Sequence, residues 1–169
     1  MAPRGGPMNV GSILLWGFLA TLALTTIQSA AQALKLTRMS LPLMLGTMLT
    51  GRWERARAWG FGFHLVNGWL FSLVYALVFE AWRRASWWTG GLLGIGHGVI
   101  VLVVLMPLLP SIHPRMATET RQPVSTALLE PPGPLAKNYG VQTPLVTLLA
   151  HVVYGVILGG FYAVTSAGG

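Results

Sequence analysis

The stretch Ala85–Pro114, ASWWTGGLLGIGHGVIVLVVLMPLLPSIHP, decides the fold because it contains no Asp, Glu, Lys or Arg. A helix needs about 20 apolar residues to cross the hydrocarbon core of a bilayer, and inside lipid it satisfies its own backbone hydrogen bonds. Residues 5–34, 58–79 and 138–169 form three further stretches without a formal charge. The sequence therefore predicts an integral membrane protein with four spanning helices.

The expected spans cover residues 10–33, 58–79, 87–109 and 143–163 of a single membrane domain, residues 1–169. Composition supports this prediction, since 53% of the residues are hydrophobic and 9% are charged, whereas about 25% are charged in a soluble domain. We therefore expect an all-α fold, an antiparallel bundle of four transmembrane helices.

The basic residues indicate how the bundle is oriented. The expected loops 34–57 and 110–142 contain eight of the 11 Lys and Arg residues, whereas the N-terminal tail, the turn at 80–86 and the C-terminus contain three. The positive-inside rule places both loops in the cytoplasm and both termini outside. The net charge of +7 then reflects loops next to anionic lipid. No basic stripe is interleaved with exposed aromatic residues, so we expect no nucleic acid partner.

An internal repeat relates the second and fourth expected spans. His64-Leu-Val-Asn-Gly68 is followed by Tyr75, and His151-Val-Val-Tyr-Gly155 is followed at the same spacing by Tyr162. The repeat predicts that the bundle consists of two similar helical hairpins. Chance similarity between apolar helices is the alternative interpretation.

Small and polar residues at helical spacing predict which helix faces touch. Small residues four apart allow close helix approach, and polar groups in lipid need partners. The glycines expected at helix contacts are Gly68, Gly94, Gly98, Gly155 and Gly159. The residues of the first span expected to face the bundle interior are Gly17, Thr21, Thr25, Gln28 and Gln32.

Four histidines are the candidate ligand- or cofactor-binding residues: His64, His97, His113 and His151. The simplest hypothesis is that they form hydrogen bonds between helices. The alternatives are that two of them ligate a haem b iron, that several hold zinc or copper, or that they relay protons. No His-x-x-x-His pair, nearby Asp or Cys selects a metal, so no metal is assigned.

Catalytic motifs are absent from the sequence. There is no phosphate loop, dinucleotide glycine fingerprint or zinc-hydrolase helix. The four acidic residues, Glu54, Glu80, Glu119 and Glu130, lie outside the expected spans or at their ends. We therefore expect a protein that is not an enzyme.

The loop regions contain two features of their own. Residues 41–50 are apolar but too short to span, so they are expected to be interfacial or re-entrant. The proline-rich segment 110–142 contains Leu128, Leu129 and Leu135, which suggests that part of it packs back on the bundle.

Several strings resemble a family of small, uncharacterised bacterial membrane proteins. They are Leu-Pro-Leu-Met-Leu-Gly-Thr from residue 41, His64-Leu-Val-Asn-Gly-Trp-Leu-Phe, Ile112-His-Pro-Arg-Met116, Glu130-Pro-Pro-Gly133 and Asn138-Tyr-Gly140. The resemblance covers roughly residues 11–163. It implies a four-helix inner-membrane protein and carries no activity or binding residue.

Two functions follow as hypotheses. The first is a non-enzymatic membrane protein that acts by association, as a homo-oligomer or as an accessory subunit of a membrane complex, with the lipid bilayer as its environment. The second is a ligand-, haem- or metal-binding or transport protein that uses His64, His97 and His151. Cofactor content discriminates between them.

Overall fold

The computed structural model describes residues 8–118 and 129–164, and these residues form helices, two short helical segments and connecting loops, with no strand among them. The helices are α1 (Val10–Ala33), α2 (Leu41–Leu49), α3 (Trp53–Trp82), α4 (Trp87–Ile100), α5 (Met106–Ile112) and α6 (Thr143–Phe161). The short segments are a π-helix, η1 (Val101–Leu105), and a 3-10 helix, η2 (Pro134–Tyr139). The all-α class is confirmed.

Four helices are long and apolar enough to cross a membrane: α1, α3, α6 and the continuous helix Trp87–Ile112 that joins α4, η1 and α5. This confirms the predicted number of such helices and, within a few residues, the bounds of three of them. The exception is α3, which begins at Trp53 rather than at residue 58. Charged residues at 54, 55 and 57 made the sequence look like a loop there, but they lie on an exposed helical turn.

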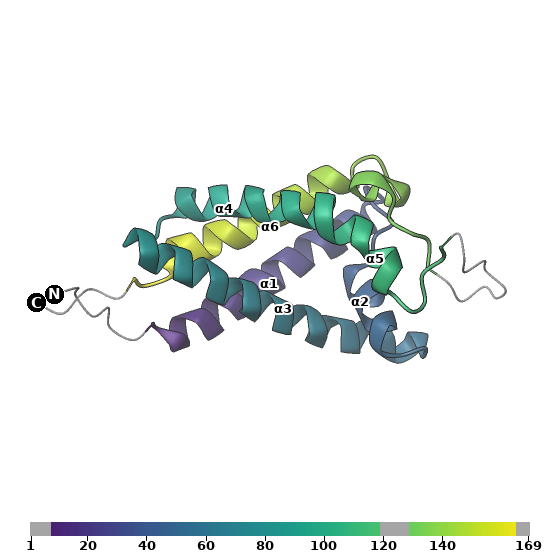
Figure 1. Cartoon of the computed structure of the whole chain (residues 1–169), viewed down its shortest axis with the longest axis horizontal. Helices are drawn as coiled ribbons and strands as arrows, with labels where there is room; N and C mark the ends of the chain where they lie inside the picture. The colour runs from purple at the N-terminus through teal and green to yellow at the C-terminus, as the bar shows by residue number, and fades with distance from the viewer. Residues whose placement is uncertain (1–7, 119–128, 165–169) are drawn as a thin grey trace, which may run out of the picture.

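The helices follow one another in the spatial order α4, α6, α1, α3 (Figure 1). The α4–α6 pair is the most closely packed. A Cβ atom on Gly90 would overlap the backbone of Gly155, and a Cβ atom on Gly94 would overlap the backbone of His151. On the other side of the molecule, a Cβ on Gly68 of α3 would overlap the hydroxyl of Thr21 on α1. Gly90 and Gly94 of α4 thus meet Gly155 and His151 of α6, in that order.

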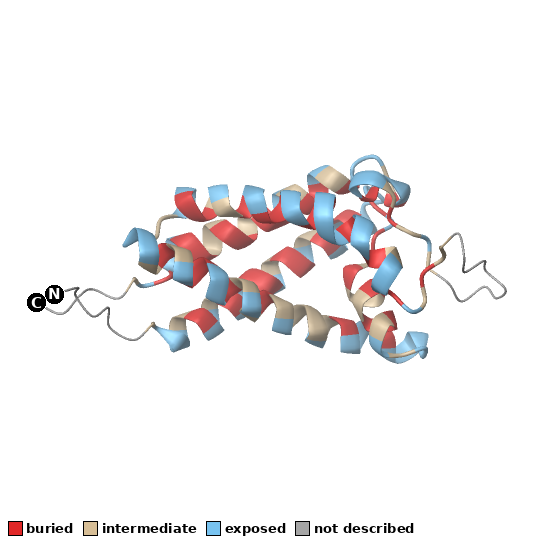
Figure 2. Ribbon diagram, in the orientation of Figure 1, coloured by how far each residue is buried: buried red, intermediate tan, exposed pale blue. Residues whose placement is uncertain are grey.

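Buried residues lie on the helix faces that meet, and exposed residues form the outer surface (Figure 2). Along α1 the buried polar side chains are Thr21, Thr25 and Gln28, as the polar stripe predicted. Gln32 is exposed, so the stripe prediction is wrong for that residue. The stripe ends there because α1 ends at Ala33 and the chain turns away at Lys35, which has a positive φ of 61°.

The short helix α2 packs against the first turns of α3. A Cβ on Gly46 would overlap the carbonyl oxygen of Ala56, and a Cβ on Gly60 would overlap that of Pro42. Helices approach this closely only where side chains are small. The segment 34–57 was expected to be a loop. It instead contains α2 and the first turn of α3, which pack against each other.

The third long helix contains a π turn just before Pro107. The Met106 N–H donates to the carbonyl of Val101, five residues earlier. Proline has no N–H and its ring clashes with the carbonyl four residues before it, so a wider turn accommodates Pro107. Val101 and Leu105, at the two ends of this turn, border the cavity described below.

The loops gather at the end of the molecule where α2 lies (Figure 1). The hydroxyls of Thr37 and Thr143 are 2.7 Å apart, and Arg38 lies 3.1 Å from Glu130. Leu129 packs against the core, as predicted for the proline-rich segment, whereas Leu135 is 37% exposed. Leu128 lies outside the described residues.

Candidate functional site

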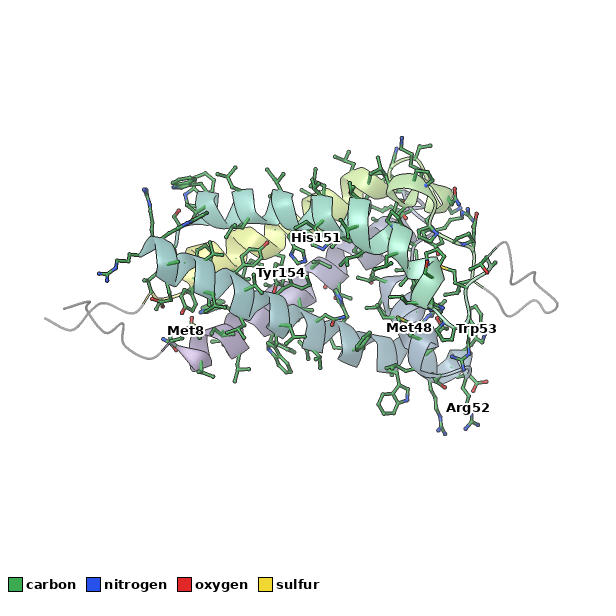
Figure 3. All side chains as sticks on the ribbon, in the orientation of Figure 1. Met8, Met48, Arg52, Trp53, His151 and Tyr154 are labelled. Atoms are coloured by element: carbon green, nitrogen blue, oxygen red, sulfur yellow. The ribbon has the colours of Figure 1, made fainter. Side chains whose placement is uncertain are left out.

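A cavity of about 240 Å³ lies between α3 and the α4–η1–α5 helix. Gln28 of α1 and both Thr147 and His151 of α6 line it as well, and α2 borders it at one end. Most of its wall is hydrocarbon or thioether, with four methionines: Met39, Met44, Met48 and Met106. Figure 3 shows His151 and Tyr154 in the middle of the molecule and Met48 at the end formed by α2.

Three of the four candidate histidines line this one cavity: His64, His97 and His151. The rings of His97 and His151 meet edge to face, with centroids 4.6 Å apart. The ring of Phe71 stacks on His97 at 3.9 Å. The fold thus brings together histidines from three helices that are far apart in the sequence.

The backbone fixes the tautomer of His151. Its Nδ1 atom lies 2.7 Å from the carbonyl oxygen of Thr147, one turn earlier in α6. A carbonyl only accepts, so Nδ1 carries the proton and donates it. In the neutral ring, Nε2 is then left as the hydrogen-bond acceptor.

Packing glycines set the position of His151. Gly94 lies against the His151 backbone, and a Cβ on Gly98 would lie 3.3 Å from the His151 Cβ. Two further glycines predicted to lie at helix contacts, Gly155 and Gly159, both lie against Gly90 of α4. The small residues of α4 and α6 therefore bring His97 and His151 within contact distance.

A polar layer lies beside the histidines, between α3 and α6. The Tyr154 hydroxyl donates to the carbonyl oxygen of Gly68 at 2.6 Å and lies 2.8 Å from the Ser72 hydroxyl. The Tyr75 hydroxyl is 3.5 Å from Nδ1 of His97. These contacts satisfy the buried hydroxyl groups within the helix interface.

Other polar atoms at the cavity have no partner among the described residues. They are both side-chain polar atoms of Gln28, Nε2 of His64 and Oγ1 of Thr147, and all of them are buried. All three residues line the cavity. An unsatisfied buried polar group costs about 1–3 kcal/mol, so native proteins rarely retain several in one place without a use for them.

His113 has a different setting from the other three histidines. It is fully buried, but it does not line the cavity. Its Nδ1 accepts a hydrogen bond from the Arg115 backbone N–H at 3.0 Å, so its Nε2 carries the proton and donates to the Met44 carbonyl at 3.0 Å. Arg115 in turn donates to the Thr47 carbonyl at 2.7 Å. His113 thus fastens the end of α5 to α2.

The arrangement does not suit a haem held between His97 and His151, because the two rings touch and leave no space for a porphyrin. Within residues 8–118 and 129–164, no three His, Asp or Glu side chains converge as metal ligands. The polar groups of the cavity are arranged instead to give and receive hydrogen bonds.

The sequence predicted His64, His97 and His151 as candidate site residues and Gln28 as facing the bundle interior, but it singled out neither Asn67 nor Thr147. Gln28 carried a usable signal, since a glutamine in the middle of an apolar span needs a partner. The contribution of α2 carried none, because nothing in its sequence shows where a short apolar helix packs.

No family model, curated protein or solved structure matches the chain. The resemblance of its sequence strings to a bacterial membrane family therefore stays a prediction.

Proposed function

We propose that the protein binds a small, neutral, largely apolar molecule inside its membrane-spanning part. The observation that carries this proposal is the set of unpartnered atoms on Gln28, His64 and Thr147 at one apolar cavity. A bound molecule with oxygen or nitrogen substituents satisfies these atoms, and its apolar body fills the remaining space. This is the second of the two functions that the sequence suggested.

Charge supports a neutral ligand. The residues that line the cavity include no Asp, Glu, Lys or Arg. An ion in such a place would be far from any counter-charge, and its desolvation would cost several kcal/mol. Water also satisfies polar atoms, but it gains little beside the methionine and leucine side chains that form most of the wall.

The membrane context completes the proposal. The four long apolar helices form an antiparallel bundle of two hairpins in a bacterial inner membrane, with α2 and the proline-rich segment on the cytoplasmic side. The supporting observation is the concentration of Lys and Arg in the segments that gather at that end. Bound molecules would then be held in the cytoplasmic half of the bilayer.

Association with a second copy or with another membrane protein remains a separate prediction from the sequence. The mass of the particle purified in mild detergent tests it. A particle larger than one chain plus its detergent supports association, and a monomeric particle counts against a homo-oligomer.

The test of the binding function is to identify what the protein carries. Wild-type protein and the double variant Gln28→Leu/His64→Leu are purified in mild detergent, and small molecules are extracted and identified by mass spectrometry. We expect a neutral lipophilic molecule at near-stoichiometric amounts with the wild type and its loss from the double variant. Gln32→Leu is the control, because Gln32 lies on the same helix but is exposed. Equal extracts from wild type and double variant would contradict the proposal.

A further inference from the structure

We propose that the cavity holds the oxygen-substituted ring of an amphipathic molecule whose hydrocarbon tail extends into the bilayer between α3 and α5. This inference rests on the proposed function and specifies the class of its ligand. It follows from the size of the cavity, its aromatic wall, its hydrogen-bonding groups and the side on which it opens.

The size of the cavity limits the part of the ligand that is enclosed. A protein cavity of about 150 Å³ holds one benzene molecule. The 240 Å³ available here therefore suits about ten non-hydrogen atoms, by proportion with that case. One six-membered ring with a few small substituents fills such a space, whereas a steroid or a two-chain lipid headgroup exceeds it.

The aromatic side chains favour a flat ring. Phe71 is stacked on His97, with centroids 3.9 Å apart, and both residues line the cavity together with Phe63. Aromatic rings pack best against one another in stacked or edge-to-face contact. A flat, conjugated head therefore matches this wall better than a branched aliphatic group does.

The unpartnered polar atoms determine which substituents the ring carries. Gln28 offers one acceptor and an amide donor, and the Thr147 hydroxyl acts in either sense. Nε2 of His64, the other unpartnered atom at the cavity, donates or accepts according to the tautomer of the ring. Carbonyl or hydroxyl oxygens on the ring satisfy these groups without introducing a charge.

The cavity opens on the outer surface of the molecule. Leu105, Leu108 and Ile112 line it, yet they are 40%, 48% and 56% exposed. Helices α3 and α5 are not among the closely packed helix pairs, and residues of both line the cavity. In a membrane this opening faces hydrocarbon, so a tail attached to the ring continues into lipid without crossing a polar region.

Two probes with the same head test the inference: methyl-benzoquinone and decyl-benzoquinone. Binding is measured to purified protein in lipid nanodiscs, and empty nanodiscs give the amount of each probe dissolved in the lipid. Affinities are expressed relative to the concentration of the probe dissolved in the lipid, so that membrane partitioning of the tail does not count as binding. We expect both probes to bind the wild type with similar affinity, because a tail in lipid gains nothing further from the protein.

Leu108→Trp narrows the opening, and Leu77→Trp is the matched control, since Leu77 is 51% exposed on α3 and does not line the cavity. Leu108→Trp should weaken binding of the decyl probe by about tenfold or more, the range that a steric mismatch in a pocket produces. It should weaken binding of the methyl probe much less, and Leu77→Trp should change the binding of neither probe. Binding of the methyl probe but not the decyl probe to the wild type would overturn the inference but not the function. An equal loss of affinity for both probes in Leu108→Trp would do the same. Failure of both probes to bind the wild type would contradict a ring-binding cavity and leave only the extraction experiment to support binding.

Discussion

Gly94 of α4 lies directly against the backbone of His151 on α6, so that a Cβ atom on Gly94 would overlap the His151 carbonyl oxygen and lie 2.8 Å from the Val152 Cα. The contact joins packing to the site, because His151 is held at the cavity by the helix that carries His97. Any group larger than hydrogen at this position must move the backbone of α6.

Gly94→Ala should therefore lower the stability of the protein by about 1–3 kcal/mol, the usual cost of overpacking. Thermal unfolding in detergent measures the effect. Gly96→Ala is the control, because a Cβ on Gly96 of the same helix meets nothing within 4 Å, and alanine is the better helix former. Equal stability of the two variants would mean that α4 and α6 are not in this contact.

The hydrogen bond from Tyr154 to the Gly68 carbonyl links α6 to α3 at 2.6 Å. Tyr154→Phe removes it while keeping the ring, which is 1% exposed. Hydrogen bonds between membrane helices contribute about 0.6 kcal/mol on average and up to about 1.7 kcal/mol. We expect a lower melting temperature for Tyr154→Phe, and an unchanged one would show that the bond does not stabilise the helix pair.

The orientation in the membrane is open to direct labelling, because the chain contains no cysteine. Arg55 and Arg84 are both exposed, and they lie at opposite ends of α3, in its first turn and just after its last residue. A membrane-impermeant maleimide added to intact spheroplasts should label Arg84→Cys and leave Arg55→Cys unlabelled until the membrane is permeabilised. The opposite pattern would reverse the orientation and place α2 outside the cell.

Tyr139 should make the stability depend on alkaline pH. Burial and the nearby Glu130 carboxylate raise the pKa of Tyr139 from 10.0 to about 12, although Arg38 acts in the opposite direction. Between these two pH values the unfolded chain loses this proton while the folded chain retains it, so stability falls as the pH rises. The melting temperature of Tyr139→Phe should fall less steeply over this range than that of the wild type. Parallel curves would show that Tyr139 titrates normally.

The sequence predicted the elements better than their connections. Uncharged length predicted four long apolar helices, and helical spacing predicted burial of Thr21, Thr25 and Gln28. The start of α3 was missed because residues 54, 55 and 57 are charged, although one side of that turn carries Ala56, which packs on α2. The π turn before Pro107 is a local response to a missing N–H that periodicity does not reveal.

The site was predicted in part for a similar reason. Histidines in apolar spans attract attention by residue type, and three of the four line the cavity. Whether the neighbours of a histidine satisfy its ring nitrogens depends on tertiary contacts, such as those of His113 with Met44 and Arg115. The cavity lies between α3 and the α4–η1–α5 helix, and no local sequence pattern specifies the spacing of two helices.

The central claim is that the polar atoms of the cavity bind a ligand. Its most direct test is the thermal stability of Gln28→Leu, without and with methyl-benzoquinone. Gln28 is 1% exposed, and neither of its side-chain polar atoms has a partner among the described residues. Leucine removes that unsatisfied pair, so the empty variant should be more stable than the empty wild type by about 1–3 kcal/mol. The probe should raise the melting temperature of the wild type, because it binds the folded state, and should raise that of Gln28→Leu much less. A Gln28→Leu variant that is less stable than the wild type and is stabilised equally by the probe would show that Gln28 serves the fold and not a ligand.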